Sequence, residues 1–340
     1  VMLVSFVGAL FILTPTHMRE FTQSMAATVM FVSNIFFYMT SGYFNTTAEF
    51  IPLLHTWSLA VEEQFYLIFP IIMMGTFFMT KHMLLYVLIG LTLLSFGWAN
   101  WSSFYADPTS SFYLLVSRGW EILVGSITAI ALTRPEWKGF QHVPILTKQC
   151  LSSVGLCLII ISFFIFGYST PHPSYFTLTP VIGTVLVILF GSKHTLVCWI
   201  LSKRLFVGFG LISYSLYLWH QPIFVFNRYH TLLPPSDNKT IILILLALLL
   251  SIFSWYFIER PFRNASRISK KILVISLGLT ALLIGAISIA GNLSGGFSKR
   301  MKYPPNIEWI HIGQKLYIEG EICEKAPVQD YPHIEQCYFG

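Results

Sequence analysis

Long apolar runs recur along the whole chain, and short polar segments separate them. About 20 helical residues cross a bilayer core of about 30 Å at about 1.5 Å per residue. The pattern predicts an all-α, polytopic transmembrane helix bundle with about nine to ten membrane segments. The predicted segments are Val1–Leu13, Met25–Tyr38, Trp57–Phe78, Met83–Asn100, Phe112–Leu132, Cys150–Phe166, Thr179–Phe190, Leu205–Asn227, Thr240–Phe257 and Ile272–Asn292.

Two of the predicted segments are short. Val1–Leu13 cannot span a bilayer alone, and we interpret it as the remainder of a longer helix. As a helix, Met25–Tyr38 would be about 21 Å long, shorter than a bilayer core of about 30 Å, which favours a re-entrant or tilted element.

Composition supports a membrane protein, because 55% of the residues are apolar and only 11% are charged. The net charge of +6 does not indicate nucleic-acid binding, since Lys and Arg lie in short loops between apolar runs. Taken alternately, one set of loops carries twelve of these residues and the other only two, Arg228 and Lys239. The positive-inside rule makes the first set cytoplasmic. A multi-pass protein of the cytoplasmic (inner) membrane is expected.

The chain after Asn292 differs from the rest. Residues 293–340 are polar, contain Gly295-Gly296 and Pro304-Pro305, and have no long apolar run. We predict a transmembrane domain over residues 1–292 and an extracytoplasmic linker over 293–340. Cys323 and Cys337 are candidates for a disulfide in an oxidising outer compartment, with two unpaired thiols as the alternative.

The most informative stretch runs from His55 to Tyr66, HTWSLAVEEQFY, and it opens an apolar run. Ionisable groups inside a membrane are costly, so Glu62 and Glu63 suggest function. His55 and Glu62 share a helix face but lie about 10.5 Å apart along it, too far for a hydrogen bond. A catalytic pair therefore needs a partner from another helix. The alternative is that His55 and Trp57 pack at an interface and the glutamates anchor an ion pair.

Two further polar groups lie within predicted spans. Arg118 and Glu121 can pair with each other at i,i+3, or Arg118 can meet Glu62 or Glu63. Ser213, Tyr217 and His220 share a helix face next to Pro222, which invites a kink and a polar cavity. An interfacial aromatic belt is the alternative there.

Depth connects these groups. With the charge-derived orientation, Glu62, Glu63, Arg118 and His220 all lie about 8–11 Å inside the outer boundary. We therefore predict a water-accessible cavity in the outer half of the membrane.

Several other kinds of site have no sequence support. GxSxG, HExxH, CxxC and a phosphate-binding loop are absent, and the ten histidines are scattered, so no metal site is predicted. A transporter or flippase for a lipid-linked glycan would also place polar groups at one depth. A purely structural anchor leaves the buried charges unexplained.

Several blocks, in order, resemble the acyltransferase-3 family. They are FVSNI from Phe31, SGYF from Ser41, Leu54 to Tyr66, RGWE from Arg118, TPVIG from Thr179, Ile212 to Pro222, and Ile258 to Arg263. The resemblance implies transfer of an O-acetyl or related acyl group from cytoplasmic acetyl-CoA to a sugar hydroxyl. The acceptor would be O-antigen (lipopolysaccharide) or peptidoglycan.

The resemblance also suggests roles for the polar residues. Glu62, Glu63, Arg118 and His220 are expected to be catalytic, and His55, Ser58, Glu121 and Tyr217 to bind substrate. No permanently bound cofactor is expected. The expected partners are membrane lipid, acyl-CoA and a surface polysaccharide or lipid-linked glycan.

The family pattern extends beyond both ends of this chain. Its first helix carries an Arg and, ten residues later, a His, and neither falls within these 340 residues. The tail resembles the connector to an SGNH-type outer domain. We therefore expect these 340 residues alone to be inactive.

Overall fold

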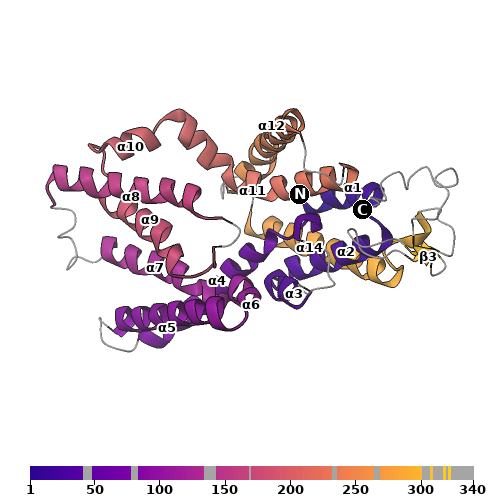
Figure 1. Cartoon of the computed structure of the whole chain (residues 1–340), viewed down its shortest axis with the longest axis horizontal. Helices are drawn as coiled ribbons and strands as arrows, with labels where there is room; N and C mark the ends of the chain where they lie inside the picture. The colour runs from indigo at the N-terminus through magenta and orange to yellow at the C-terminus, as the bar shows by residue number, and fades with distance from the viewer. Residues whose placement is uncertain are drawn as a thin grey trace.

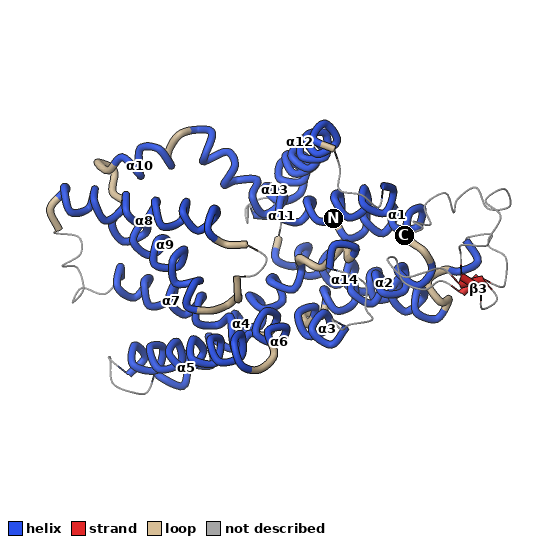
Figure 2. Tube along the Cα trace, in the orientation of Figure 1, coloured by secondary structure: helices blue, strands red, loops and turns tan. Residues whose placement is uncertain are grey.

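Helices form almost all of the described structure (Figure 2). The computed structural model describes residues 1–40, 48–77, 83–133, 143–167, 170–231, 236–263 and 269–300, and three two-residue strands beyond them. The α-helices are α1 (Met2–Ile12), α2 (Pro15–Val29), α3 (Ser33–Thr40), α4 (Thr56–Phe77), α5 (Met83–Tyr105), α6 (Pro108–Tyr113), α7 (Leu115–Thr133), α8 (Ile145–Ile165), α9 (Leu178–Phe190), α10 (Leu196–Leu201), α11 (Arg204–Thr231), α12 (Asp237–Ser254), α13 (Arg260–Arg263) and α14 (Lys270–Leu293).

Shorter elements complete the described chain. Single 3₁₀ turns lie at Ala48–Phe50 (η1), Tyr175–Thr177 and Ser298–Arg300, and a π-helical turn, Trp255–Glu259, joins α12 to α13. The tail contributes β1 (Ile307–Glu308), β2 (Tyr317–Ile318) and β3 (Glu321–Ile322), which pair antiparallel in that order. Cys323 and Cys337 lie outside the described residues.

The helices form two groups that meet at α4 (Figure 1). In one, α5 packs on α7 and α8 packs on α9. In the other, α2 packs on α14 and α11 packs on α12. The largest buried apolar cluster lies in the second group and includes Phe21, Met25 and Ile284. Helix α4 touches both groups, so side chains on its first turns can meet partners from either.

The prediction that Met25–Tyr38 forms one membrane segment is wrong, because two helices, α2 and α3, share these residues. Helix α2 begins in the polar region before it, where Pro15 is the first helical residue and the Thr14 side chain caps the N-terminus. It ends at Val29, and the chain turns at Phe31, which has a φ of 55°. The amide of Val32 donates to the Ala27 carbonyl at 2.9 Å, closing this left-handed helix end before α3 begins.

Six helical segments within the described residues are long and apolar enough to cross a membrane: Thr56–Thr76, Met83–Tyr105, Pro108–Thr133, Ile145–Ile165, Asp237–Arg263 and Lys270–Leu293. These confirm a polytopic helical bundle, while the count of nine to ten segments stays a prediction. Their outward surfaces are apolar; on α8, for example, Phe163 is 80% and Phe164 85% exposed. Such surfaces are suited to contact with lipid. The predicted span Phe112–Leu132 is interrupted at Leu114, between α6 and α7.

Helices α8 and α9 cross at two glycines. A Cβ atom added to Gly155 would lie 2.6 Å from the Gly183 carbonyl oxygen, and one added to Gly183 would lie 2.7 Å from the Gly155 carbonyl oxygen. Close backbone approach through small residues is a common means of helix association in membranes, where no hydrophobic force drives helices together.

Gly155→Ala is therefore expected to destabilise the fold by about 1–3 kcal/mol, because the two backbones must separate. The measurement is unfolding in mixed micelles, followed by circular dichroism. Gly97→Ala is the matched control, since nothing lies within 4 Å of its added Cβ. Equal stability of the two variants would contradict the importance of this crossing.

Candidate functional site

The chain enters α4 through a firmly held turn. Thr56, the first residue of α4, donates its hydroxyl to the Leu53 carbonyl at 2.8 Å. The Ser33 hydroxyl of α3 donates to the Thr56 carbonyl at 2.9 Å, and Thr28 of α2 contacts the Thr56 hydroxyl at 3.0 Å. This turn therefore fixes His55, which directly precedes α4, against two neighbouring helices.

Four predicted site residues meet between α4 and α11, and we call them the imidazole cluster: His55, Ser58, Tyr217 and His220. The Tyr217 hydroxyl donates to the His55 carbonyl and lies 2.5 Å from the Ser58 hydroxyl. The His55 ring lies edge-on to the rings of Tyr217 and His220, with centroids 5.2 and 5.6 Å away. His55 is 7% exposed, and neither of its ring nitrogens has a hydrogen-bond partner in the described part of the chain. Buried polar atoms without partners are unusual and suggest a functional role.

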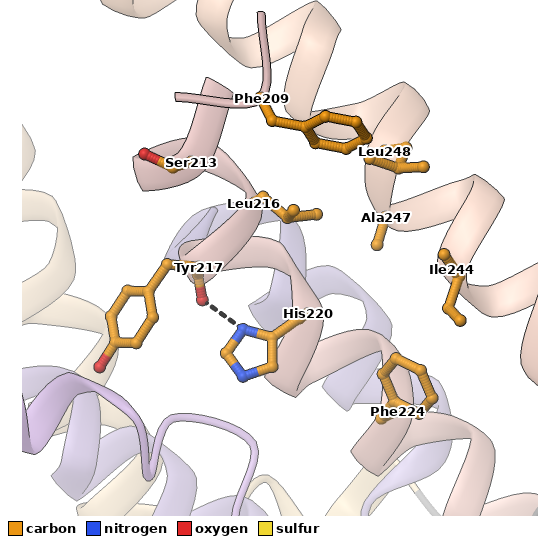
Figure 3. A pocket seen from close by; sticks show the side chains of 9 residues that line it. All are labelled: Phe209, Ser213, Leu216, Tyr217, His220, Phe224, Ile244, Ala247 and Leu248. Carbon is orange, nitrogen blue, oxygen red and sulfur yellow. Dashed lines mark hydrogen bonds between the residues drawn. The ribbon is translucent and has the colours of Figure 1, made fainter. Parts of the chain in front are cut away.

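The orientation of His220 assigns its tautomer. Its Nδ1 lies 2.6 Å from the Tyr217 carbonyl oxygen (Figure 3). Because a carbonyl can only accept, Nδ1 carries the hydrogen in this bond. In the neutral ring, Nε2 is then unprotonated and available as a base.

Tyr217 and His220 also line a cavity of about 560 Å³ between α11 and α12. Its remaining lining is mostly apolar, with Phe209, Phe224 and Ile244 among the residues drawn in Figure 3. Helix α11 is continuous from Arg204 to Thr231 and has Pro222 in its interior.

The two glutamates lie further along α4. Glu62 is exposed and Glu63 is half-buried, and neither forms an ion pair with a described residue. Glu62 is close enough to Tyr217 to interact with its hydroxyl electrostatically. The predicted alternative of an ion-pair anchor therefore finds no partner among the described side chains.

Arg118 pairs with its own helix neighbour. Its Nη1 lies 3.2 Å from Glu121 Oε1, with the side chains 13% and 26% exposed. Its Nε donates to the Phe112 carbonyl at 3.1 Å, and its guanidinium lies 5.2 Å from the centre of the Trp57 ring. The hypothesis that Arg118 meets Glu62 or Glu63 is therefore wrong, because the i,i+3 pair satisfies it locally.

Arg118 still reaches the first turn of α4, through Trp57 rather than through a glutamate. Burial and the Arg118 charge also lower the pKa of His172, which lies in the loop before α9. Arg118 therefore contacts the start of α4 at Trp57, whereas Tyr217 of the imidazole cluster contacts it at His55 and Ser58.

Sequence reasoning missed one polar link beside the site. Gln64 of α4 donates to the Asn34 side chain at 2.8 Å and to the Phe31 carbonyl at 2.9 Å. Asn34, which is 1% exposed, donates to the Tyr113 carbonyl at 3.2 Å. An asparagine inside the apolar run around Phe31 was the available signal. This amide pair joins α3, α4 and α6.

The arrangement defines a polytopic membrane protein with a polar site between α11 and α4, one of its candidate membrane spans. No group of three or more His, Cys, Asp or Glu side chains in the described residues could hold a metal ion. The acyltransferase domain family, Acyl_transf_3, matches residues 2–260, and the chain belongs to this family.

Proteins named as O-acetyltransferases or putative O-acetyltransferases are similar to the chain. Peptidoglycan O-acetyltransferase OatA of Listeria monocytogenes is 28% identical over 262 residues, 74% of this chain and 42% of that protein. O-acetyltransferase OatA of Staphylococcus aureus (strain MRSA252) is 28% identical over 300 residues, 80% of this chain and 48% of that protein. A putative O-acetyltransferase of S. aureus (strain COL) is 27% identical over 274 residues, 78% of this chain and 45% of that protein. The chain thus spans less than half the length of these relatives, and no solved structure matches it.

Glu121→Gln is expected to destabilise the fold by about 3 kcal/mol, because it leaves the largely buried Arg118 without its counter-charge. Thermal unfolding in detergent measures this loss. Glu49→Gln is the matched control, since Glu49 pairs with Arg228 but is 59% exposed, and exposed pairs contribute about 0–1 kcal/mol. Similar losses of stability for both variants would contradict a special contribution of the Arg118–Glu121 pair to the free energy of unfolding.

Tyr217→Phe is expected to loosen α4 from α11, because one hydroxyl bonds to both His55 and Ser58. A double-mutant cycle with Ser58→Ala should give a coupling energy of about 0.5–3 kcal/mol in unfolding experiments. Additive losses would show that the two hydroxyls do not act together.

Proposed function

We propose that the chain is the membrane domain of an O-acetyltransferase that modifies a cell-wall polysaccharide. The observation that carries this proposal is a pair of imidazoles in contact, the buried His55 and the half-buried His220, in a chain of the acyltransferase family. One similar protein, OatA of L. monocytogenes, is named a peptidoglycan O-acetyltransferase, which supports a glycan acceptor.

Transfer requires removal of a proton from a sugar hydroxyl. The Nε2 of His220 is suited to accept it, because Nδ1 is committed to the Tyr217 carbonyl. As the acceptor oxygen bonds to the acyl carbon, the bond from that carbon to the donor sulfur breaks, and the proton passes to the leaving thiolate. General base catalysis of this kind contributes about 10²–10⁴-fold.

Other polar residues have supporting roles in this proposal. Glu62, which interacts electrostatically with Tyr217, and Glu63, next to it on α4, orient the base or bind acceptor hydroxyls. His55, Ser58 and Tyr217 position the acceptor. Arg118 and Glu121 act indirectly: they position Trp57 and, through it, the first turn of α4.

Acetyl-CoA is the proposed donor, and peptidoglycan is favoured over O-antigen as the acceptor, because OatA of L. monocytogenes is named for peptidoglycan. The loop charges support a cytoplasmic-membrane protein whose tail after Asn292 is extracytoplasmic. In this orientation the imidazole cluster lies in the outer half of the membrane, where a cell-wall glycan arrives.

His220→Ala is expected to reduce acetyl transfer at least about 100-fold, because it removes the proposed base. The assay uses inverted and right-side-out vesicles containing the complete protein, with radiolabelled acetyl-CoA, and follows label in the glycan. His194→Ala, on the turn before α10, is the control and should leave the rate unchanged. Movement of glycan without label would favour a transporter instead, and full activity of His220→Ala would overturn the assignment of the base.

A further inference from the structure

A second cavity lies at the polar face of α2, away from α12. It has a volume of about 170 Å³ and is formed by α2, α3, η1 with the residues after it, and the end of α11. Pockets for drug-sized ligands occupy about 300–1,000 Å³, so this cavity suits one small ring. None of the residues proposed above for catalysis or for positioning the acceptor lines this cavity.

The lining combines aromatic rings with hydrogen-bonding groups. Phe36, Phe50 and Tyr229 contribute rings, and the Phe50 and Tyr229 rings meet edge-on at 5.4 Å. The Tyr229 hydroxyl donates to the Phe50 carbonyl at 3.1 Å, which holds the two rings in place. The aromatic wall is therefore preformed.

The polar part of the lining comes from one helix. His17, Glu20, Gln23 and Ser24 are spaced at i, i+3, i+6 and i+7 along α2 and therefore share a face. His17 packs edge-on against Tyr229 at 5.5 Å, while its Nδ1 lies 2.9 Å from the Thr14 hydroxyl. Carboxylate, amide, imidazole and hydroxyl groups thus face an aromatic wall across a small cavity.

We propose that this cavity binds one sugar residue of the glycan acceptor. A sugar ring presents an apolar C–H face, which suits an aromatic ring, and an edge of hydroxyls that both donate and accept hydrogen bonds. An apolar lipid tail does not match the carboxylate, amide and imidazole groups of this lining, and a bare cation cannot accept hydrogen bonds from the donors among them. The inference rests on the proposed function, since it assigns part of the acceptor site.

The cavity is also close to the imidazole cluster along the chain. Ile51 and Pro52 line it, and His55 follows three residues after Pro52, which limits the span to about 10–11 Å. Gln221, beside His220, donates to the Ile51 carbonyl at 3.3 Å. A sugar held in the cavity would thus place its neighbour along the glycan near His55 and His220.

The test uses the complete protein in vesicles and a peptidoglycan glycan fragment carrying a diazirine. Wild-type protein should crosslink within α2, η1 or the end of α11, and Glu20→Gln and Phe50→Leu should each reduce this labelling at least about five-fold. Glu49→Gln is the matched control, because Glu49 neighbours Phe50 but does not line the cavity. Labelling elsewhere, or equal labelling in all variants, would overturn the proposal.

Acetyl-transfer kinetics provide the second readout. Both cavity variants should raise the KM for the glycan at least about ten-fold, with the KM for the acyl donor and the melting temperature unchanged. A fall in kcat alone, with the glycan KM unchanged, would overturn the proposal. If wild-type protein transfers no acetyl group but crosslinks here as expected, the proposed function fails while the glycan site stands.

Discussion

The contact on which the site depends is the bond from the Tyr217 hydroxyl to the His55 carbonyl. It joins residues 162 positions apart in the chain and ties the start of α4 to the middle of α11. Within a membrane, polar groups find few alternative partners, so a single hydroxyl that also contacts Ser58 can set how two elements meet. The imidazoles of His55 and His220 face each other because this contact fixes the helices that carry them.

The first turn of α4 serves both helix groups at once. His55 and Ser58 face α11, while Trp57, between them in the chain, packs on Phe112 at 4.7 Å and lies under the Arg118 guanidinium. The largely buried Arg118–Glu121 pair therefore contacts this turn through Trp57 and not through a glutamate of α4. Thr56 anchors the same turn to α2 and α3, so the segment is held from three sides.

Much of the helical pattern could be predicted from apolar runs, because α4, α8 and α14 are long, apolar and bounded by polar residues. The turn at Phe31 could not, since a positive φ at a phenylalanine follows from tertiary packing and has no local sequence signal. In the site, the i,i+3 geometry allowed the Arg118–Glu121 pair to be considered from sequence alone. The meeting of His55 with His220 could not, because it depends on how α4 and α11 pack.

Within the site, the group that is neutral before the reaction is buried, and the groups that are charged are more exposed. An imidazole is neutral until it accepts a proton, so burying His55 costs far less than burying a carboxylate. Glu62 and Glu63 carry charge in their ordinary form, and they lie at more exposed positions on the same helix. In the proposed reaction, the half-buried His220 takes the proton next to the neutral, buried His55, while the charged carboxylates of Glu62 and Glu63 stay at the more exposed positions of α4.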